Sequence, residues 1–206
     1  MYMNLFTKLN LTVKIDELRQ YYNIVETKFN HLRWSWDLYG NTIVKQWSDA
    51  VYNDPDNLKT YGWAIQSNLK DSTKVSPPWN ISSDDTSEYY NTPIAFGIIE
   101  KLQDAIPYGY RWAISVQPPD GKVSLHSDQE DEATVWIPIH TEGVAIVFVT
   151  DEKTTGYQLE SDGSLYLLDT TIPHYTYNSS NKNRVAVIFR LPRSKIAELL
   201  AITGSL

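Results

Sequence analysis

Two hydrophobic patterns divide the chain near residue 110. In the first part, apolar side chains recur at helical spacing over 14–29 and again over 93–105, and each stretch predicts a helix. Thr92 can cap the second helix, and Pro93 suits its first turn. The segment between the two helices is rich in Pro, Asn, Asp and Ser, which predicts loops with short strands and not a second domain.

The second part of the chain has the pattern of short β-strands separated by turns. Pro118 to Gly121 and Ser161 to Gly163 carry typical turn residues. About eight short strands with tight turns indicate an antiparallel jelly roll. A short helix is expected over 194–201, after Pro192. The strands are expected over residues 111–117, 122–127, 133–140, 144–150, 156–160, 164–168, 173–178 and 183–191.

The predicted fold class is therefore mainly β: a double-stranded β-helix (jelly roll, cupin-like) with N-terminal helices packed on it. We expect a single domain over residues 1–206. Its jelly-roll catalytic core would span 110–192, after a helical and loop extension (1–109) that contributes to the substrate cleft. Residues 193–206 would end the chain in a helix. A chain of 206 residues can bury a core without a stabilising metal, so a metal site would serve function.

Composition narrows the range of functions. There is no cysteine, which excludes disulfides, thiolate metal sites and cysteine nucleophiles. The net charge is -7 and no dense Lys/Arg run occurs, so no nucleic-acid partner is expected. No apolar run approaches the roughly 18 residues of a membrane span. The N-terminal residues lack the basic and apolar segments of a secretion signal, so we expect a cytoplasmic protein that does not bind membranes.

The candidate chemistry centres on three side chains. His126 and Asp128 are two residues apart on a predicted strand, so they project from the same face. His174 comes from another predicted strand and supplies a third ligand. Two histidines and one carboxylate form the facial triad of Fe(II) oxygenases, which leaves other metal positions open. A His-x-Asp tripeptide alone is weak support, since His126 could equally be a half-buried strand histidine.

Arg184 adds to this pattern from the last predicted strand. Val185, Val187 and Phe189 would face the opposite side of that strand, so Arg184 would point into the cavity with the metal ligands. A guanidinium there can bind the far carboxylate of a dicarboxylate co-substrate in a bidentate manner. The alternative is an edge-strand arginine paired with a surface acid.

The order His-x-Asp, distal His and then Arg ten positions later resembles the iron(II)- and 2-oxoglutarate-dependent dioxygenases. Residues 111–184 more specifically resemble the aspartyl/asparaginyl β-hydroxylase-like branch. The matching features are the Arg111 strand, the Pro-Asp-Gly turn before Leu125-His126-Ser127-Asp128, the WIPIHT segment from Trp136 to Thr141, Asp169, His174, Asn178 and Arg184.

The resemblance implies an enzyme with Fe(II) held by His126, Asp128 and His174, and with 2-oxoglutarate and O2 as co-substrates. Arg184 would hold the 5-carboxylate of 2-oxoglutarate. The reaction would hydroxylate an unactivated C–H of a peptide side chain, an amino acid or another small metabolite, with succinate and CO2 as co-products. Thr134 and Trp136 stand where the branch usually has an Arg and a His, so these two positions also bear on co-substrate binding.

Several residues have both a functional and a structural interpretation. Arg111 and His140 are candidate substrate contacts, but an ion-paired arginine and a structural strand histidine are the alternatives. The acidic run that begins at Asp128 is expected to be a solvated loop beyond that residue, or to attract a cationic substrate.

The rival function is a cupin-like metal-binding protein that is non-catalytic or independent of 2-oxoglutarate. A cupin enzyme of that kind would use three or four histidine ligands, with His140 as the additional one.

Overall fold

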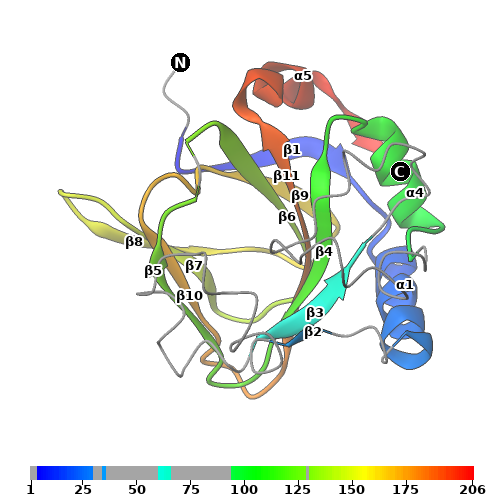
Figure 1. Cartoon of the computed structure of the whole chain (residues 1–206), viewed down its shortest axis with the longest axis horizontal. Coiled ribbons are helices and arrows are strands. Elements are labelled where there is room, and N and C mark those ends of the chain that lie inside the picture. The colour runs from blue at the N-terminus through cyan, green and yellow to red at the C-terminus, as the bar shows by residue number, and fades with distance from the viewer. Residues whose placement is uncertain (1–3, 30–33, 36–59, 66–93, 129) are drawn as a thin grey trace, which may run out of the picture.

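Two β-sheets face each other in the computed structural model, which describes residues 4–29, 34–35, 60–65, 94–128 and 130–206. Figure 1 shows the larger sheet through the middle of the molecule and the smaller sheet to one side. The larger sheet has the order β12-β1-β9-β6-β11-β4-β3-β2 and the smaller β5-β10-β7-β8.

The bounds of the elements are as follows. The larger sheet contains β1 (Phe6–Thr12), β2 (Trp34–Ser35), β3 (Tyr61–Ala64), β4 (Tyr110–Gln117), β6 (Glu132–His140), β9 (Ser164–Leu168), β11 (Arg184–Pro192) and β12 (Gly204–Ser205). The smaller sheet contains β5 (Lys122–His126), β7 (Val144–Val149), β8 (Thr154–Gln158) and β10 (His174–Tyr177). The helices are α1 (Ile15–Lys28), α4 (Ile98–Ala105) and α5 (Ile196–Ala201), the last preceded by the 3-10 turn η5 (Arg193–Lys195).

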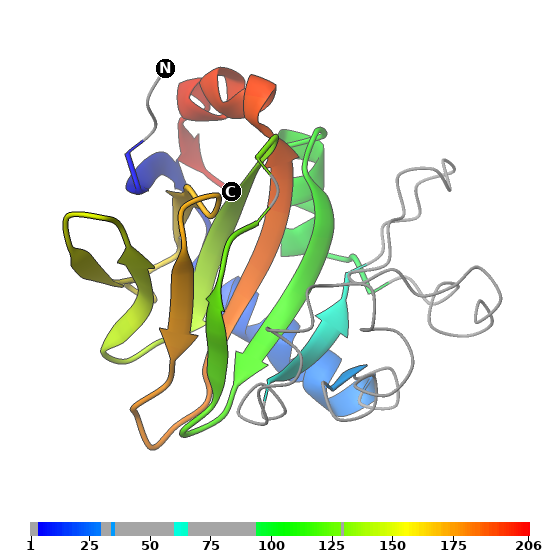
Figure 2. The same ribbon diagram turned by 60° about the vertical axis from the view of Figure 1, so that its left-hand side comes forward.

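The central strand of the larger sheet, β11, separates two environments. It pairs antiparallel with β4 on one side and with β6 on the other. Val185, Val187 and Phe189 face the side that the helices cover, where they are buried in the main hydrophobic core. The alternate residues Arg184, Ala186 and Arg190 therefore face the smaller sheet, because successive strand side chains point to opposite faces. Figure 2 shows β6 and β11 of the larger sheet facing β5 and β10 of the smaller sheet.

The helices α1 and α4 pack on the outer face of the larger sheet, away from the smaller sheet (Figure 1). Leu18 and Val25 of α1 and Ile99 and Leu102 of α4 are buried there. The predicted start of the second helix was wrong. The helix begins at Ile98, because Gly97 adopts a positive φ of 59° that a right-handed helix does not allow. Thr92 and Pro93, the expected cap and first residue, lie outside the described residues.

The fold class predicted from the sequence is confirmed: the chain is mainly β, with two facing sheets of a jelly roll and helices packed on one of them. Each of the eight expected strands is present, within one or two residues of its predicted bounds. Two strands were missed: β1, and the two-residue β12, which lies in the segment 193–206 that was expected to end the chain in a helix. Residues Phe6–Thr12 form β1, which buries Leu9 and Leu11 and pairs with β9 inside the larger sheet.

None of the helices in the described part of the chain combines the length and the apolar composition that crossing a bilayer requires.

Candidate metal centre

His126 and His174 lie side by side on the smaller sheet. They are directly opposite residues of the antiparallel pair β5–β10. Their ring centroids are 4.3 Å apart, and the His174 side chain is buried. The sheet register therefore brings together two histidines that are far apart in the sequence, as the sequence pattern predicted.

Both imidazole rings are oriented by the backbone. Nδ1 of His126 lies 2.7 Å from the carbonyl oxygen of Ser124, and Nδ1 of His174 lies 3.0 Å from that of Ile172. A carbonyl only accepts hydrogen bonds, so Nδ1 carries the proton in each neutral ring and Nε2 keeps its lone pair. Burial and the neighbouring His126 lower the pKa of His174 to about 4. His174 is thus neutral at neutral pH, the state that binds metals.

Asp128 follows β5 and reaches the same region. Its backbone N–H donates to the carbonyl oxygen of Thr170 at 2.8 Å, and its side chain is only 4% exposed. Oδ1 lies 3.9 Å from Nε2 of His126. Burial is the largest single influence on the pKa of Asp128 and acts to raise it, but Arg190, the two neighbouring histidines and a hydrogen bond from Thr170 together outweigh it and hold the pKa below its ordinary value. The carboxyl is therefore ionised at neutral pH, as a metal ligand must be.

The donor chemistry of these three residues fits an iron(II) centre: two imidazoles with free Nε2 atoms and one carboxylate. Within the described residues, however, no three His, Cys, Asp or Glu side chains already stand close enough to enclose a metal ion. Ligands about 2.1 Å from a metal at right angles would be about 3 Å apart, so the 3.9 Å between His126 and Asp128 must shorten.

A buried ionic network adjoins Asp128, and the sequence did not predict it. Arg190 of β11 donates to Asp128 Oδ1 at 2.9 Å and to Glu132 Oε2 at 2.8 Å. Glu132 also accepts hydrogen bonds from Tyr110 at 2.7 Å and from Arg111 at 3.2 Å. The expectation of a solvated acidic loop was wrong for Glu132, which begins β6 and is buried among these partners.

Arg184 lies on the same face of β11, and its charge is also buried. Nη1 donates to Gln117 Oε1 at 2.9 Å and to the Ala145 carbonyl at 2.8 Å. Nη2 donates to the carbonyls of Val144 and Tyr177, at 2.6 and 2.8 Å. Nε is buried and has no hydrogen-bond partner among the described residues. Burial lowers the pKa of Arg184 to about 10, which leaves it charged at neutral pH.

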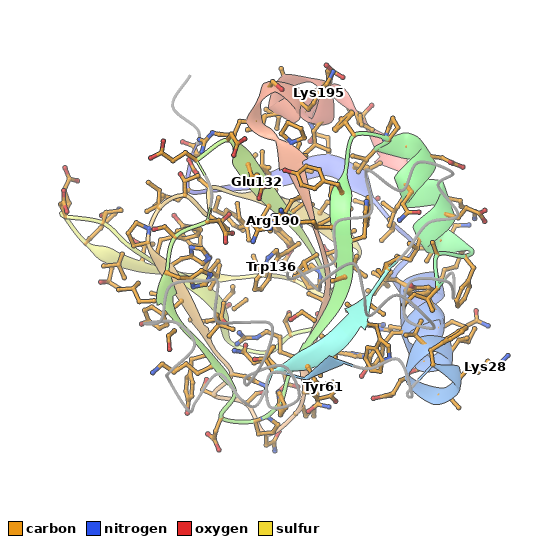
Figure 3. All side chains as sticks on the ribbon, viewed as in Figure 1. Lys28, Tyr61, Glu132, Trp136, Arg190 and Lys195 are labelled. Atoms are coloured by element: carbon orange, nitrogen blue, oxygen red, sulfur yellow. The ribbon has the colours of Figure 1, made fainter. Side chains whose placement is uncertain are left out.

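Thr134 and Trp136 share the inner face of β6 with Glu132. Thr134 lies opposite Arg190 in the sheet, and its hydroxyl is 3.5 Å from Asp128 Oδ2. Trp136 packs against the smaller hydrophobic core between the sheets and lies opposite Tyr166 of β9. Figure 3 shows Glu132, Arg190 and Trp136 in a row along this inner face. The structure thus brings Thr134 next to the triad and places Trp136 deeper between the sheets.

The two candidate substrate contacts have different surroundings. Arg111 joins the ionic network through Glu132, and its backbone has a positive φ of 52°. His140 lies at the far end of β6 opposite Val185, and its ring makes an edge contact with Tyr22 of α1 at 6.2 Å. His140 is therefore not brought together with the triad.

Two residues that carry the family resemblance hold the fold around the site. Asp169 accepts hydrogen bonds from both terminal nitrogens of Arg193, each at 2.9 Å. Asn178 is fully buried and donates to the carbonyls of Gln117 and Lys182, both at 2.7 Å. These contacts hold the segments before and after β10.

No protein family model matches this chain, and no curated protein matches its sequence. Solved structures do resemble it. A prolyl-4-hydroxylase of Pseudomonas putida is similar over 93% of this chain and 94% of its own, with a TM-score of 0.50 and 10% identity. A protein of the 2OG-Fe(II) oxygenase family from Burkholderia pseudomallei is similar over 42% of this chain and 44% of its own, at 17% identity and a TM-score of 0.36.

A cupin domain of Bordetella pertussis is similar over 39% of this chain and 79% of its own, with a TM-score of 0.32 and 21% identity. At such identities the resemblance shows the fold alone. The class that the fold defines is the jelly-roll, double-stranded β-helix proteins, which include both cupins and 2-oxoglutarate oxygenases.

Proposed function

We propose that the protein is an Fe(II)- and 2-oxoglutarate-dependent oxygenase that hydroxylates an unactivated C–H bond. The observation that carries the proposal is the pair His126 and His174. They face each other across β5 and β10, each with Nδ1 bonded to a carbonyl and Nε2 free, beside the ionised Asp128. This donor set matches the facial triad of such oxygenases.

In this proposal His126, Asp128 and His174 bind the iron and leave its remaining positions open. Iron bound in this way activates O2 together with 2-oxoglutarate, which is converted to succinate and CO2. The protein orients the ligands through backbone carbonyls and excludes water with the aromatic side chains between the sheets, such as Trp136 and Phe148.

The buried charges support a dianionic co-substrate. In the network beside the triad, Arg111 and Arg190 balance Asp128 and Glu132, so the four side chains carry no net charge. A divalent cation would leave two positive charges in excess in a buried site, and an unpaired buried charge is costly. The buried Arg184 adds a third positive charge, and the two carboxylates of 2-oxoglutarate would neutralise two of the three.

Arg184 remains our candidate for the 5-carboxylate of 2-oxoglutarate, with a changed binding mode. Its terminal nitrogens already donate to four protein acceptors, whereas Nε is buried without a partner among the described residues. We therefore propose that Nε donates to the carboxylate, in place of the bidentate grip of both terminal nitrogens. A ligand oxygen there would satisfy a buried donor that otherwise costs about 1–3 kcal/mol.

The substrate of this reaction is proposed only by class. The resemblance of residues 111–184 to the aspartyl/asparaginyl β-hydroxylase-like branch favours a peptide side chain, an amino acid or another small metabolite, in the cytoplasm. Thr134 and Trp136 replace the Arg and His of that branch, and Thr134 lies beside Asp128. The co-substrate would therefore contact this part of β6 through a hydroxyl and not through a cation.

The rival, a cupin-like metal protein with three or four histidine ligands, has less support. His140, the remaining histidine in the described part of the chain, packs against Tyr22 on the helix side of the larger sheet. It would have to cross the sheet to join the other two. Among the described residues, the proposed donor set near the centre is therefore two histidines and one carboxylate.

Succinate formation tests the proposal. The protein is incubated with Fe(II), ascorbate, 2-oxoglutarate and O2, and succinate is quantified against a control without protein. We expect slow turnover even without the primary substrate, loss of it in His174→Ala, and no change in His140→Ala. A wild-type protein that forms no succinate above the protein-free control, or a His174→Ala variant that forms as much as wild type, would contradict it.

A further inference from the structure

We infer that Arg190 is a positioning residue that holds the Asp128 carboxylate in place for the metal. The inference rests on the proposed function, and it concerns an arginine outside the ligand set and outside the co-substrate site. Asp128 lies in a connection after β5, where no strand fixes its side chain. Arg190 comes from β11, the central strand of the larger sheet.

The contact with Arg190 involves the oxygen that matters for the metal. Oδ1 of Asp128 accepts a hydrogen bond from Arg190 Nη2 at 2.9 Å, and the same oxygen lies 3.9 Å from Nε2 of His126. The second oxygen, Oδ2, has the Thr134 hydroxyl at 3.5 Å. Arg190 thus holds Oδ1 on the side of the histidines.

Arg190 is itself held by a second carboxylate. Its Nη1 donates to Glu132 Oε2 at 2.8 Å, and Glu132 is fixed in turn by Tyr110 and Arg111. A planar guanidinium that spans two carboxylates keeps both at a fixed distance, which a lysine ammonium cannot do. The chain of contacts runs from β4 through β6 and β11 to the metal ligand.

The positive charge of Arg190, taken alone, would weaken metal binding. A cation next to Asp128 repels a divalent metal, so removing Arg190 would strengthen metal binding if electrostatics decided the outcome. Glu132 offsets this repulsion, because it carries the balancing negative charge on the same guanidinium. We therefore expect the geometric role to dominate, since loss of residues that orient a metal ligand typically lowers metal affinity by about 10–100-fold.

Cobalt(II) binding without 2-oxoglutarate tests the inference, with affinity and the visible d–d spectrum as the two readouts. The variants are Arg190→Met, Arg190→Lys and Glu132→Gln. Arg193→Met is the matched control, because Arg193 also pairs with a largely buried carboxylate, that of Asp169. Its side chain hydrogen-bonds to Asp169 and Thr171, and neither belongs to the triad. Circular dichroism and thermal unfolding establish which variants fold.

Positioning predicts weaker cobalt binding, by about 10–100-fold, in both Arg190 variants and in Glu132→Gln, with an altered d–d spectrum. Arg193→Met should bind cobalt like wild type. If Arg190→Met does not fold, Arg190→Lys and Glu132→Gln decide the question. Unchanged or tighter binding in the Arg190 variants that fold would overturn the inference, as would wild-type affinity and spectrum in Arg190→Lys.

The cobalt measurements can be distinguished from a failure of the proposed oxygenase activity. A wild-type protein that binds cobalt but forms no succinate from 2-oxoglutarate would refute the oxygenase, while the affinities still decide the role of Arg190. A wild-type protein that binds no cobalt would overturn both, because Arg190 would then position no metal ligand.

Discussion

The two histidines of the candidate centre are held in the same way, by short-range contacts. In each case Nδ1 bonds to the carbonyl of the residue two positions earlier, Ser124 for His126 and Ile172 for His174. The local backbone therefore selects the tautomer before any metal arrives, and each free Nε2 is left for coordination. Such preorganisation reduces the cost of ordering the ligands on binding.

Among the glycines that the structure describes, Gly163 has the least room for a side chain. Its φ is +90°, and a Cβ there would clash with the Val13 carbonyl oxygen. Gly163→Ala should lower the free energy of unfolding by about 2–4 kcal/mol, measured by urea denaturation. Gly97→Ala is the control, because Gly97 also has a positive φ but has open space around it. Equal losses in the two variants would contradict the steric explanation.

At the scale of elements, β6 and β11 each carry two functions on opposite faces. One face is apolar and packs under the helices, with Ile137 and Val187 fully buried. The other face carries Glu132, Thr134 and Arg190 toward the smaller sheet. Because strand side chains alternate, the stable core and the polar site share the same backbone without mixing. Stability and metal binding should therefore be separable by mutation.

Ile137→Ala tests that separation. Ile137 is 0% exposed and belongs to the core between the larger sheet and the helices. Truncation should cost about 2–5 kcal/mol of the free energy of unfolding. Cobalt(II) affinity at 15 °C, where the variant is expected to remain folded, should equal that of wild type. A folded variant with much weaker cobalt binding would show that the two faces are coupled.

The jelly-roll strands could be predicted from the sequence, but the side-chain contacts that depend on how the two sheets pack could not. Side chains alternate along Arg184–Pro192, which places Arg190 on the same face as Arg184. The inward orientation of Arg190 could therefore have been predicted from the sequence. The contacts of Arg184 were not, because its acceptors are carbonyls of β7 and of the end of β10, and their approach depends on how the two sheets pack. β1 was not predicted because the apolar side of its alternating pattern is short: only Leu9 and Leu11 are buried, between the polar Lys8 and Asn10.

At the scale of the molecule, the larger sheet supplies the framework and the smaller sheet supplies the histidines. The proposed ligand set is completed between them by Asp128, which Arg190 connects to the larger sheet. The segment before β10 is tied to the C-terminal part by Asp169 and Arg193. The histidine pair could be predicted as a set from the sequence, whereas the ionic network depends on three strands meeting in space.

The Asp169–Arg193 pair should make stability depend on pH. Burial acts to raise the pKa of Asp169, but hydrogen bonds from Arg193 and Thr171 outweigh it and lower the pKa. A depressed folded-state pKa stabilises the fold above the unfolded value of about 3.9, and this is lost as pH falls through the folded pKa. Asp169→Asn should therefore cost about 1.5–3 kcal/mol at pH 7, and clearly less near pH 3. Urea denaturation at both pH values measures it, and a pH-independent difference would refute the ion pair as its source.

We propose that His126, Asp128 and His174 hold an iron that 2-oxoglutarate chelates. The most direct measurement is an anaerobic titration of the Fe(II)-loaded protein with 2-oxoglutarate, followed by the weak visible charge-transfer band of the chelate. We expect the band in the wild type and in His140→Ala, its loss in His174→Ala, and a much weaker affinity for 2-oxoglutarate in Arg184→Ala. Iron binding without a band at millimolar 2-oxoglutarate would contradict the account and favour a metal protein that does not use this co-substrate.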